Sequence, residues 1–318
     1  MAAPAAVVLA AGAALASCGS SGGALAVRIP SSSAAPPRDT APAPVAAPAR
    51  VAAPAHVAVI VMENKEYGEV VGSRSAPFIN GLARRYAVAR GMYATTHPSL
   101  PNYLALTGGS TFGIESDCTA CSVDASANLP TQLGAARLSW KAYMEDLPYP
   151  CFTGASAGQY AKKHDPFIYY NDVRDVPRLC ARIVPLTQLA SDERSSRLPA
   201  FIWITPNLCH DMHDCAVATG DRFLSSLVPP LLRALGPSGL LFLTWDEGSS
   251  DAGCCRLASG GRVATIVAGS GARRGAQLTT PADHYSLLQT VEDLLGLRRL
   301  RNAACAGTSS LRPLLAGG

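Results

Sequence analysis

A serine between two prolines lies in the segment of this chain that is richest in chemically useful residues, 95–109 (T-T-H-P-S-L-P-N-Y-L-A-L-T-G-G). Pro98 and Pro101 flank Ser99, and the apolar run that follows predicts a helix that ends at Gly108 and Gly109. Backbone N–H groups are free at the start of a helix, so Ser99 would lie where an oxyanion or a phosphate binds. The alternative is that Ser99 only caps the helix.

Acidic residues follow two apolar runs that are typical of buried strands. Ligands of open α/β sheets bind beyond the carboxyl ends of the strands, so we expect these acids to meet there. Carboxylates that lie together repel one another unless protons or a divalent cation neutralise them. Oxygen ligands favour Mg²⁺, Ca²⁺ or Mn²⁺, and histidine ligands would favour Zn²⁺. The expected ligands are Glu63, Asn64, Asp246 and Glu247. A solvated turn at the first pair and a helix-terminal charge pair at the second are the alternatives.

Five of the six histidines fall in loops of this kind, and only His56 lies outside them. This grouping favours an active site. For the two histidines between Cys209 and Cys215 the alternative is a structural loop held by a disulfide. The five are His97, His164, His210, His213 and His284.

Strands that alternate with helices must position these residues. Apolar runs predict buried strands, and amphipathic runs predict helices between them. This order is typical of an α/β fold with a mainly parallel sheet and helices on both faces. The stretch 110–185 carries Cys, Pro and Tyr residues, and we expect an irregular, disulfide-bearing insertion over the sheet edge. The strands are expected at 56–62, 200–205, 240–245 and 263–268, and the helices at 76–89, 129–137, 219–236 and 284–295.

The N-terminal part of the chain predicts export. Residues 1–18 are small and apolar and end in Leu-Ala-Ser-Cys18, which resembles a lipoprotein signal, although no Lys or Arg precedes Arg28. Residues 19–55 form an Ala/Pro-rich linker, and residues 56–318 form the folded domain. We therefore expect a secreted or cell-surface protein with a membrane tether at Cys18.

Charge and cysteine content agree with this location. A net charge of +4 without a basic stripe excludes a nucleic-acid binder. Ten cysteines suit disulfides in an oxidising compartment, and the spacings favour the bridges Cys118–Cys121 and Cys209–Cys215. No second Cys pair completes a zinc knuckle at Cys118-x-x-Cys121.

Six motifs together resemble the phosphoesterase family, which groups acid phosphatases with bacterial phospholipases C inside the alkaline phosphatase superfamily. The resemblance runs in family order over about residues 56–297 and is greatest to secreted acid phosphatases that act on phosphatidylinositol 3-phosphate. The motifs are M-E-N-K-E-Y, T-H-P-S-L-P-N-Y-x-x-L-T-G-G, K-H-D-P-F, C-H-D-M-H-D-C, T-W-D-E-G and D-H-Y-S-L-L-x-T-V-E-D-L-L-G-L.

The resemblance implies an alkaline phosphatase-like fold and hydrolysis of phosphate monoesters through a phosphoserine. Ser99 would be the nucleophile, and Asn102 would supply an oxyanion-binding amide. The pair Asp246-Glu247 replaces the Asp-His pair of the wider superfamily, which favours one hard-metal centre over a two-zinc site. The same comparison implies that Glu63, Asn64, Asp246 and Glu247 bind the metal.

Histidines complete the expected site. His210 is the first candidate for the acid that protonates the leaving group, and His164 is the second, so we expect an acidic optimum. His284, His213 and His97 are expected to bind the substrate. The expected substrate is a phosphorylated small molecule or a phosphoinositide, and the expected state is a monomer. A phospholipase C-type phosphodiesterase is the alternative function.

Overall fold

The computed structural model describes residues 54–305 and 307–317. The expected export signal, with Cys18, and nearly all of the expected linker lie outside the described residues. Within the described ranges, no helix combines the length and the apolar character needed to cross a membrane.

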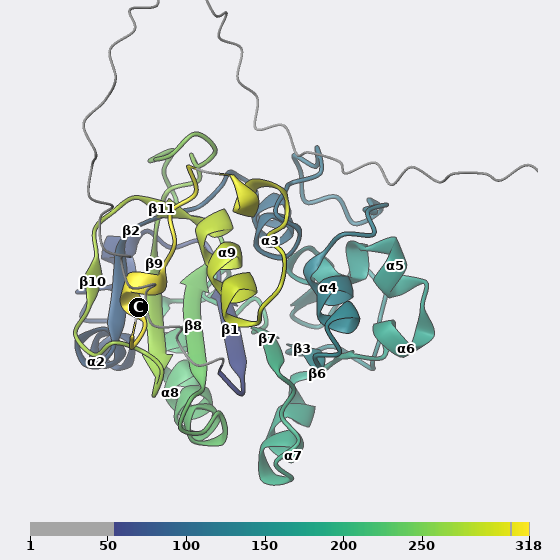
Figure 1. Ribbon diagram of the computed structural model, residues 1–318, viewed down its shortest axis with the longest axis horizontal. Helices are drawn as coiled ribbons and strands as arrows, with labels where there is room; N and C mark the ends of the chain where they lie inside the picture. The colour runs from purple at the N-terminus through teal and green to yellow at the C-terminus, as the bar shows by residue number, and fades with distance from the viewer. Residues whose placement is uncertain (1–53, 306, 318) are drawn as a thin grey trace, which may run out of the picture. The chain divides into compact units, whose positions relative to one another are not determined.

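A nine-stranded sheet forms the centre of the fold, with the order β10-β2-β9-β8-β1-β7-β3-β6 and β11 paired to β2 (Figure 1). Strand β9 is antiparallel to both β8 and β2, and the other neighbours are parallel. The strands are β1 (Val57–Met62), β2 (Ala87–Tyr93), β3 (Trp140–Met144), β6 (Ile183–Pro185), β7 (Phe201–Thr205), β8 (Leu240–Trp245), β9 (Arg262–Gly269), β10 (Gln277–Leu278) and β11 (Ala282–Asp283). Strands β4 (Ser156–Ala157) and β5 (Tyr160–Ala161) form a separate small sheet.

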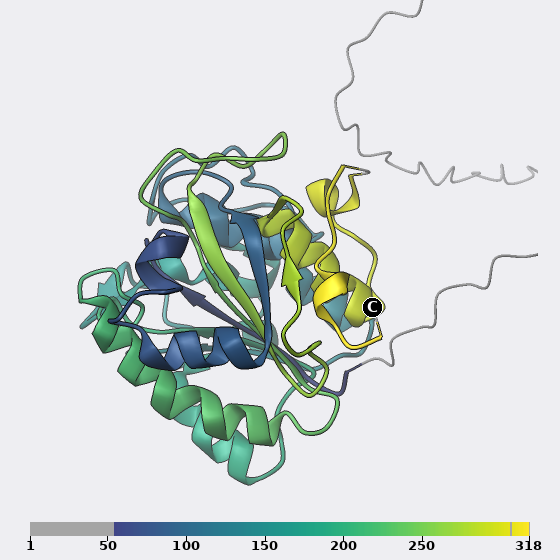
Figure 2. The same ribbon diagram turned by 90° about the vertical axis from the view of Figure 1, so that its left-hand side faces the viewer.

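Helices cover both faces of the large sheet. Figure 2 shows α2 and α8 side by side on one face and α9 on the other, where α9 packs against α3. The helices are α1 (Tyr67–Val70), α2 (Pro77–Arg85), α3 (Ser99–Gly108), α4 (Leu129–Ala135), α5 (Asn171–Arg174), α6 (Pro177–Cys180), α7 (Leu189–Arg194), α8 (Val217–Ala234) and α9 (His284–Leu294). Short 3-10 turns are η1 (Lys162–His164), η2 (Pro166–Tyr169), η3 (Leu186–Gln188), η4 (Arg301–Ala304) and η5 (Arg312–Leu314).

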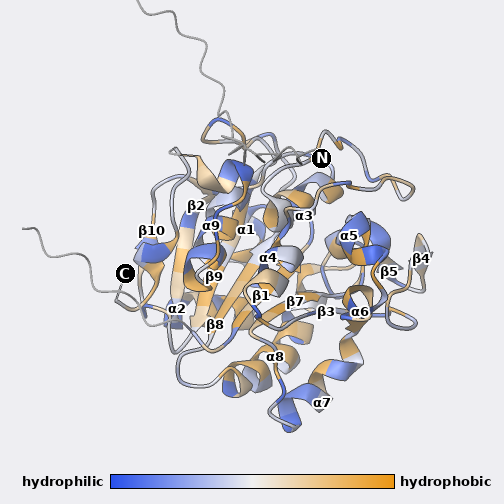
Figure 3. Cartoon of the chain, turned by 45° about the vertical axis from the view of Figure 1, so that its right-hand side comes forward, coloured by the Kyte–Doolittle hydropathy of each residue, from blue (hydrophilic) through white to orange (hydrophobic). Residues whose placement is uncertain are grey.

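The sheet forms the hydrophobic core because its central strands are buried on both faces. Every residue of β1, β7 and β8 is buried, and the same strands stand out as hydrophobic in Figure 3. Helix α3 is also buried along its whole length, and it is capped by Gly109, whose φ of 70° suits glycine. The α/β fold with a mainly parallel sheet is confirmed.

Two sequence expectations about elements need revision. The helix expected over 76–89 is wrong over its last four residues, because α2 ends at Arg85 and β2 begins at Ala87. The β2 segment A-V-A-R-G-M-Y is buried except at Arg90 and Tyr93, so sheet pairing with β9 overrides the weak helical pattern. The stretch 110–185 is also more regular than expected, since it supplies both β3 and the edge strand β6.

Four disulfides lie in the described ranges, and no cysteine there is free. Both bridges expected from spacing are present. The other two are Cys151–Cys180, within the inserted stretch, and Cys254–Cys255, in the loop between β8 and β9.

The polar loops all lie at one edge of the sheet. Because β9 is antiparallel to β8 and β2, strand β2 runs in the same direction as β1, β7 and β8, and these four strands end at the same edge. Backbone bonds tie their ends together: Asp246 N–H donates to Met62 O at 2.9 Å, and Glu63 N–H donates to Asp211 O at 2.9 Å. The loop before β9 packs closely here too, since a Cβ on Gly260 would lie 2.4 Å from Thr96 O.

Candidate active site

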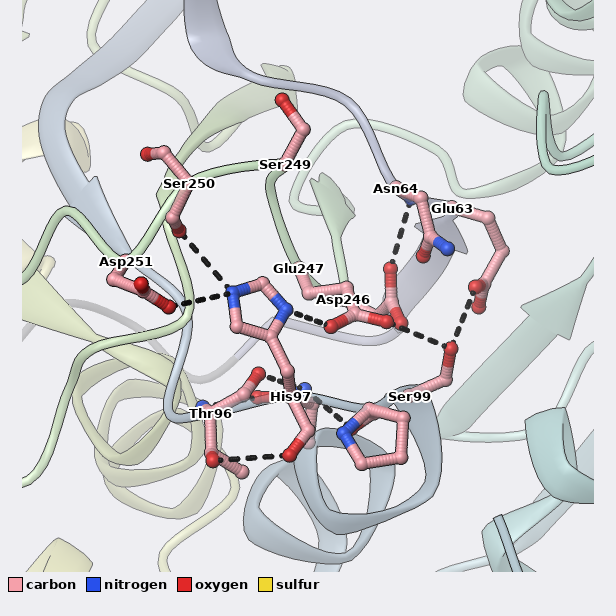
Figure 4. A network of polar contacts seen from close by, with 12 residues as sticks. Glu63, Asn64, Thr96, His97, Ser99, Asp246, Glu247, Ser249, Ser250 and Asp251 are labelled. Atoms are coloured by element: carbon pink, nitrogen blue, oxygen red, sulfur yellow. Dashed lines mark hydrogen bonds and ion pairs between the residues drawn. The ribbon is translucent and has the colours of Figure 1, made fainter. Parts of the chain in front are cut away.

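Ser99 lies at the centre of the polar edge, as the first residue of α3. Its Oγ is 3.1 Å from Glu63 Oε2 and 3.1 Å from Glu247 Oε1, so the hydroxyl proton is shared between two carboxylates (Figure 4). Glu63 follows β1, and Glu247 follows β8, the strand beside it. The structure therefore brings together three loops that are far apart in sequence, and the hydroxyl faces the acids rather than capping its own helix.

Asn64 completes this cluster from the end of β1. Its φ of 44° lies in the left-handed region, which asparagine tolerates better than most residues, and the chain turns sharply there. Its backbone N–H donates to Asp246 Oδ1 at 3.1 Å. One of the two terminal atoms of the Asn64 side-chain amide faces three carboxylate oxygens. It lies 2.9 Å from Glu63 Oε2 and 3.2 Å from both Asp246 Oδ1 and Glu247 Oε1.

The donor set of this cluster fits a hard divalent cation. With nitrogen outward, the Asn64 amide donates to the three carboxylates; with oxygen outward, it becomes a fourth oxygen ligand beside them. Spacings near 3 Å match neighbouring ligands in an octahedral shell with metal–oxygen bonds of about 2.1 Å. Asp246 Oδ2 is buried and has no hydrogen-bond partner, which leaves it available to an ion.

Burial and mutual repulsion raise the pKa of the clustered carboxyl groups. For Asp246, burial and the charge of Glu247 raise the pKa to about 8. For Glu63, burial and the charges of Asp246 and Asp211 raise the pKa well above its usual value. Burial also raises the pKa of Glu247, although its hydrogen bond to His97 opposes the shift. A buried cluster of three carboxyl groups therefore needs bound protons or a cation to be stable.

Tyr103 supports Glu63 from one turn further along α3. Its hydroxyl donates to Glu63 Oε1, and its ring stacks on His164 with centroids 5.4 Å apart. Residues four apart share a helix face, so Ser99 and Tyr103 reach the same carboxylate from one helix. Sequence reasoning missed Tyr103 as a site residue, but its spacing from Ser99 could have identified it.

His97 contacts the cluster through Glu247. Its Nδ1 pairs with Glu247 Oε2, and its Nε2 lies 3.1 Å from Ser250 O and 3.9 Å from Asp251 Oδ1 (Figure 4). Burial disfavours the charged ring, but the bond to Glu247 and the contacts with Ser250 and Asp251 raise the pKa of His97 overall. His97 therefore orients Glu247 and balances part of its charge.

His164 and His213 also lie close to Glu63. His164 Nε2 is 3.3 Å from Glu63 Oε2, and its Nδ1 is 3.4 Å from Asp211 Oδ2. Burial, followed by the charges of Lys163 and His213, lowers the pKa of His164 well below its usual value. One ligand atom each from Glu63, His164 and His213 lie within 4.8 Å of one another, a second group of metal-binding types that shares Glu63.

Two expected site histidines lie apart from these contacts. His210 Nδ1 pairs with Glu145 Oε1 at 2.9 Å, and its ring stacks on Phe223 with centroids 4.5 Å apart. His284 is fully buried between Thr95 Oγ1, 3.4 Å away, and Trp245 O, 3.2 Å away; burial lowers its pKa to about 4. Both rings are thus held by groups outside the cluster around Ser99.

Asn102 holds the loop before the helix. Its Oδ1 accepts from Thr96 N–H at 3.0 Å, and its Nδ2 donates to Thr96 O at 2.7 Å and to Pro98 O at 3.1 Å. Both amide hydrogens are therefore engaged by the backbone. The expectation that this amide faces a substrate oxyanion does not match this geometry, which makes Asn102 a positioning residue for Ser99.

We predict that Asn102→Ala lowers both stability and turnover, because three half-buried backbone groups of Thr96 and Pro98 lose their partners. Each lost hydrogen bond lowers the free energy of unfolding by up to about 3 kcal/mol, so the melting temperature should fall by several degrees. Thermal unfolding and steady-state kinetics with an aryl phosphate measure both effects. Weaker inhibition by inorganic phosphate at an unchanged melting temperature would instead favour an oxyanion-binding amide.

Sequence reasoning also missed three charged residues beside the cluster, namely Asp211, Lys163 and Asp117. Asp211, between the two histidines of the Cys209–Cys215 loop, is buried and touches His164, and burial raises its pKa to about 8. Lys163 precedes His164, and its Nζ donates to Asp117 Oδ2 at 2.9 Å. Asp211 and Lys163 lie inside quoted motifs, so a count of all charged positions there, rather than of histidines alone, would have found them.

Comparison with known proteins decides the family. The model of the phosphoesterase family matches residues 72–298. The chain belongs to the phosphoesterase family. A Mycobacterium tuberculosis phosphatidylinositol-3-phosphatase is 36% identical over 240 residues, which cover 75% of this chain and 76% of that protein. An Aspergillus fumigatus acid phosphatase is 29% identical over 259 residues, 77% of this phosphoesterase but 55% of the fungal protein.

Solved structures share the fold of this phosphoesterase. A Vibrio parahaemolyticus protein of the alkaline phosphatase superfamily aligns with a TM-score of 0.53 at 12% identity, over 79% of this chain and 70% of that one. The Listeria monocytogenes lipoteichoic acid synthase LtaP aligns with a TM-score of 0.54 at 11% identity, over 83% and 76%. At such identities the likeness concerns the fold alone, and it confirms the alkaline phosphatase-like architecture.

Proposed function

We propose that this phosphoesterase is an acid phosphatase that hydrolyses phosphate monoesters through a phosphoserine at Ser99. The observation that carries the proposal is the position of Ser99 Oγ, at the start of α3 and 3.1 Å from oxygens of Glu63 and Glu247. These carboxylates can take the hydroxyl proton, and the N–H groups at the start of α3 favour a phosphoryl group beside the oxygen. The names of the relatives support the same activity.

We propose that Glu63, Asn64, Asp246 and Glu247 hold one divalent cation of the hard, oxygen-preferring type. Their four oxygens converge, and Asp246 Oδ2 lacks a partner within the protein. A bound cation would lower the pKa of the Ser99 hydroxyl and offset the negative charge of the phosphoryl group. Tyr103 and His97 would keep Glu63 and Glu247 in place through their hydrogen bonds.

The leaving-group oxygen needs a proton from a nearby side chain. We place His164 before His210 in this role, because His164 touches Glu63 whereas Glu145 and Phe223 hold His210. Because burial lowers the pKa of His164, its ring would carry the proton only at acidic pH, in line with the expected acidic optimum. His164 lies within the second group of converging ligand atoms, next to His213. In the second half-reaction the same side chain would take the proton of the attacking water.

We further propose that the substrate is a phosphoinositide or a phosphorylated small molecule, and that the enzyme acts after export. The first part rests on the mycobacterial relative, and the second rests on the composition of residues 1–55. Phospholipase C-type cleavage of a phosphodiester is the competing function. A monomeric state and a tether at Cys18 belong to the same proposal.

Parallel assays test the proposed function. We expect the purified chain, supplied with a divalent cation, to release inorganic phosphate from vesicles that contain phosphatidylinositol 3-phosphate and from an aryl phosphate. Phosphatidylcholine vesicles should yield no phosphocholine. Phosphocholine release without hydrolysis of either monoester would overturn the proposal in favour of a phospholipase C.

A further inference from the structure

A lysine beside the cluster has no part in the mechanism proposed above. Lys163 Nζ lies 3.3 Å from His213 Nε2, and the Lys163 side chain is only 21% exposed. Burial opposes its charge, but the hydrogen bond to Asp117 and the charges of Asp117, Glu63 and Asp246 raise the pKa of Lys163. Lys163 is therefore a cation within the electrostatic field of the carboxylates around Ser99.

Asp117 occupies the donors that a phosphoryl group would use. Its Oδ2 accepts from Lys163 Nζ at 2.9 Å, and its Oδ1 accepts from the backbone N–H of Leu100 at 3.0 Å. Leu100 follows Ser99 in the first turn of α3, where N–H groups have no partner within the helix. The two oxygens of one carboxylate thus bridge an ammonium and a helix N–H beside the nucleophile, as two oxygens of a phosphoryl group can.

Unpartnered polar atoms near Ser99 give an independent indication that this region binds a ligand. His164 is 2% exposed, and its Nε2 has no hydrogen-bond partner, although it lies 3.3 Å from the Glu63 oxygen that Ser99 also approaches. Asp246 Oδ2 is also buried and unpartnered, but as a carboxylate oxygen it suits the proposed cation and not a phosphoryl oxygen. Buried polar atoms without partners are costly, so their presence here favours a bound ligand.

We propose that Lys163 and the Leu100 N–H bind the phosphoryl group of the substrate, and that Asp117 occupies these two donors until the phosphoryl group displaces it. This inference rests on the proposed phosphatase function, because the displacing group is the substrate's phosphate. A monoester dianion carries more charge than a carboxylate and competes well for an ammonium and a helix start. A diester carries one negative charge and gains less, so Asp117 would select monoesters over diesters.

Two matched variants on one loop test the proposal. Asp117→Asn keeps an acceptor for Leu100 but removes the charge that competes for Lys163, whereas Glu115→Gln removes an equal charge at an exposed position two residues away. For Asp117→Asn we expect about tenfold lower inhibition constants for inorganic phosphate and a smaller preference for an aryl monoester over an aryl diester. Glu115→Gln should change neither quantity. In a Lys163→Met background, Asp117→Asn should no longer tighten phosphate binding.

Calorimetric titration with inorganic phosphate gives a readout that does not depend on turnover. If the wild-type chain hydrolyses no monoester, the proposed function fails, and the titration still compares the variants. Tighter phosphate binding by Asp117→Asn than by Glu115→Gln supports the inference. Equal affinities of these two variants, or an unchanged gain in the Lys163→Met background, would overturn it. Thermal unfolding of each variant verifies that it is folded.

Discussion

Ser99→Ala is expected to lower kcat for an aryl phosphate by a factor of about 10⁴ or more, the range typical for loss of a nucleophile. The substitution removes only the oxygen that Glu63 and Glu247 share, and the rest of α3 stays buried. Thermal stability should therefore change by no more than about 1–2 kcal/mol. Rapid quenching of the wild-type reaction followed by mass spectrometry should find one phosphoryl group on the peptide that contains Ser99.

Ser249→Ala is the matched control for this experiment. Ser249 is exposed on the loop after β8 and contacts Glu66 through its backbone N–H, so loss of its hydroxyl should leave kcat unchanged (Figure 4). Activity of Ser99→Ala within tenfold of the wild type would contradict the assignment. The nucleophile would then have to be Thr95 or Thr96, which lie in the same loop.

Removal of divalent cations is expected to abolish turnover and to destabilise the fold in a pH-dependent way. The folded-state pKa is about 8 for both Asp246 and Asp211, raised by burial and neighbouring charge, whereas the unfolded chain releases these protons near pH 4. Between pH 4 and 8 the folded state thus binds more protons, so its stability must fall as pH rises, and the full penalty is reached above the folded pKa. A cation favours the ionised carboxylates and should offset this loss.

Melting curves from pH 5 to pH 8, with chelator or with Mg²⁺, Ca²⁺, Mn²⁺ or Zn²⁺ added back, measure the effect. A ligand at 100 times its Kd adds about 2.7 kcal/mol, which corresponds to roughly 5–10 °C for a domain of this size. The gain should grow with pH, and Asp246→Asn should remove most of it. Asp124→Asn, an exposed site, should keep it. A gain that is equal in both variants would show that the ion binds elsewhere.

Local patterns predicted the centre of the sheet because burial there follows directly from apolar sequence. Strands β1, β7 and β8 coincide with apolar runs to within a residue, and acids placed at their ends do meet. Strand β2 was missed because its segment contains Arg90 and Gly91, which interrupt the apolar pattern, and its pairing with β9 joins segments far apart in sequence. Long-range pairing is a tertiary effect that a local pattern does not contain.

Prediction from residue type alone assigned a direct role in the site to some side chains that have other partners, and it missed other side chains that do contact the site. Asn102 was expected to face the substrate, but backbone groups of Thr96 and Pro98 take both of its amide hydrogens. His210 was preferred over His164 although Glu145, which follows β3, pairs with its ring. These partners come from segments that sequence spacing does not relate to one another. Their positions become apparent only when the sheet order is known.

The loops that meet at Ser99 come from opposite halves of the polypeptide. Asn64 and Asp246 are separated by 182 positions, and Ser99 and Glu247 by 148. A ribosome that has made only the first two hundred residues has produced the alcohol but neither of the acids that follow β8. If Ser99, Asp246 and Glu247 act as proposed, the nascent chain lacks a complete site until β8 and the loop after it have been synthesised.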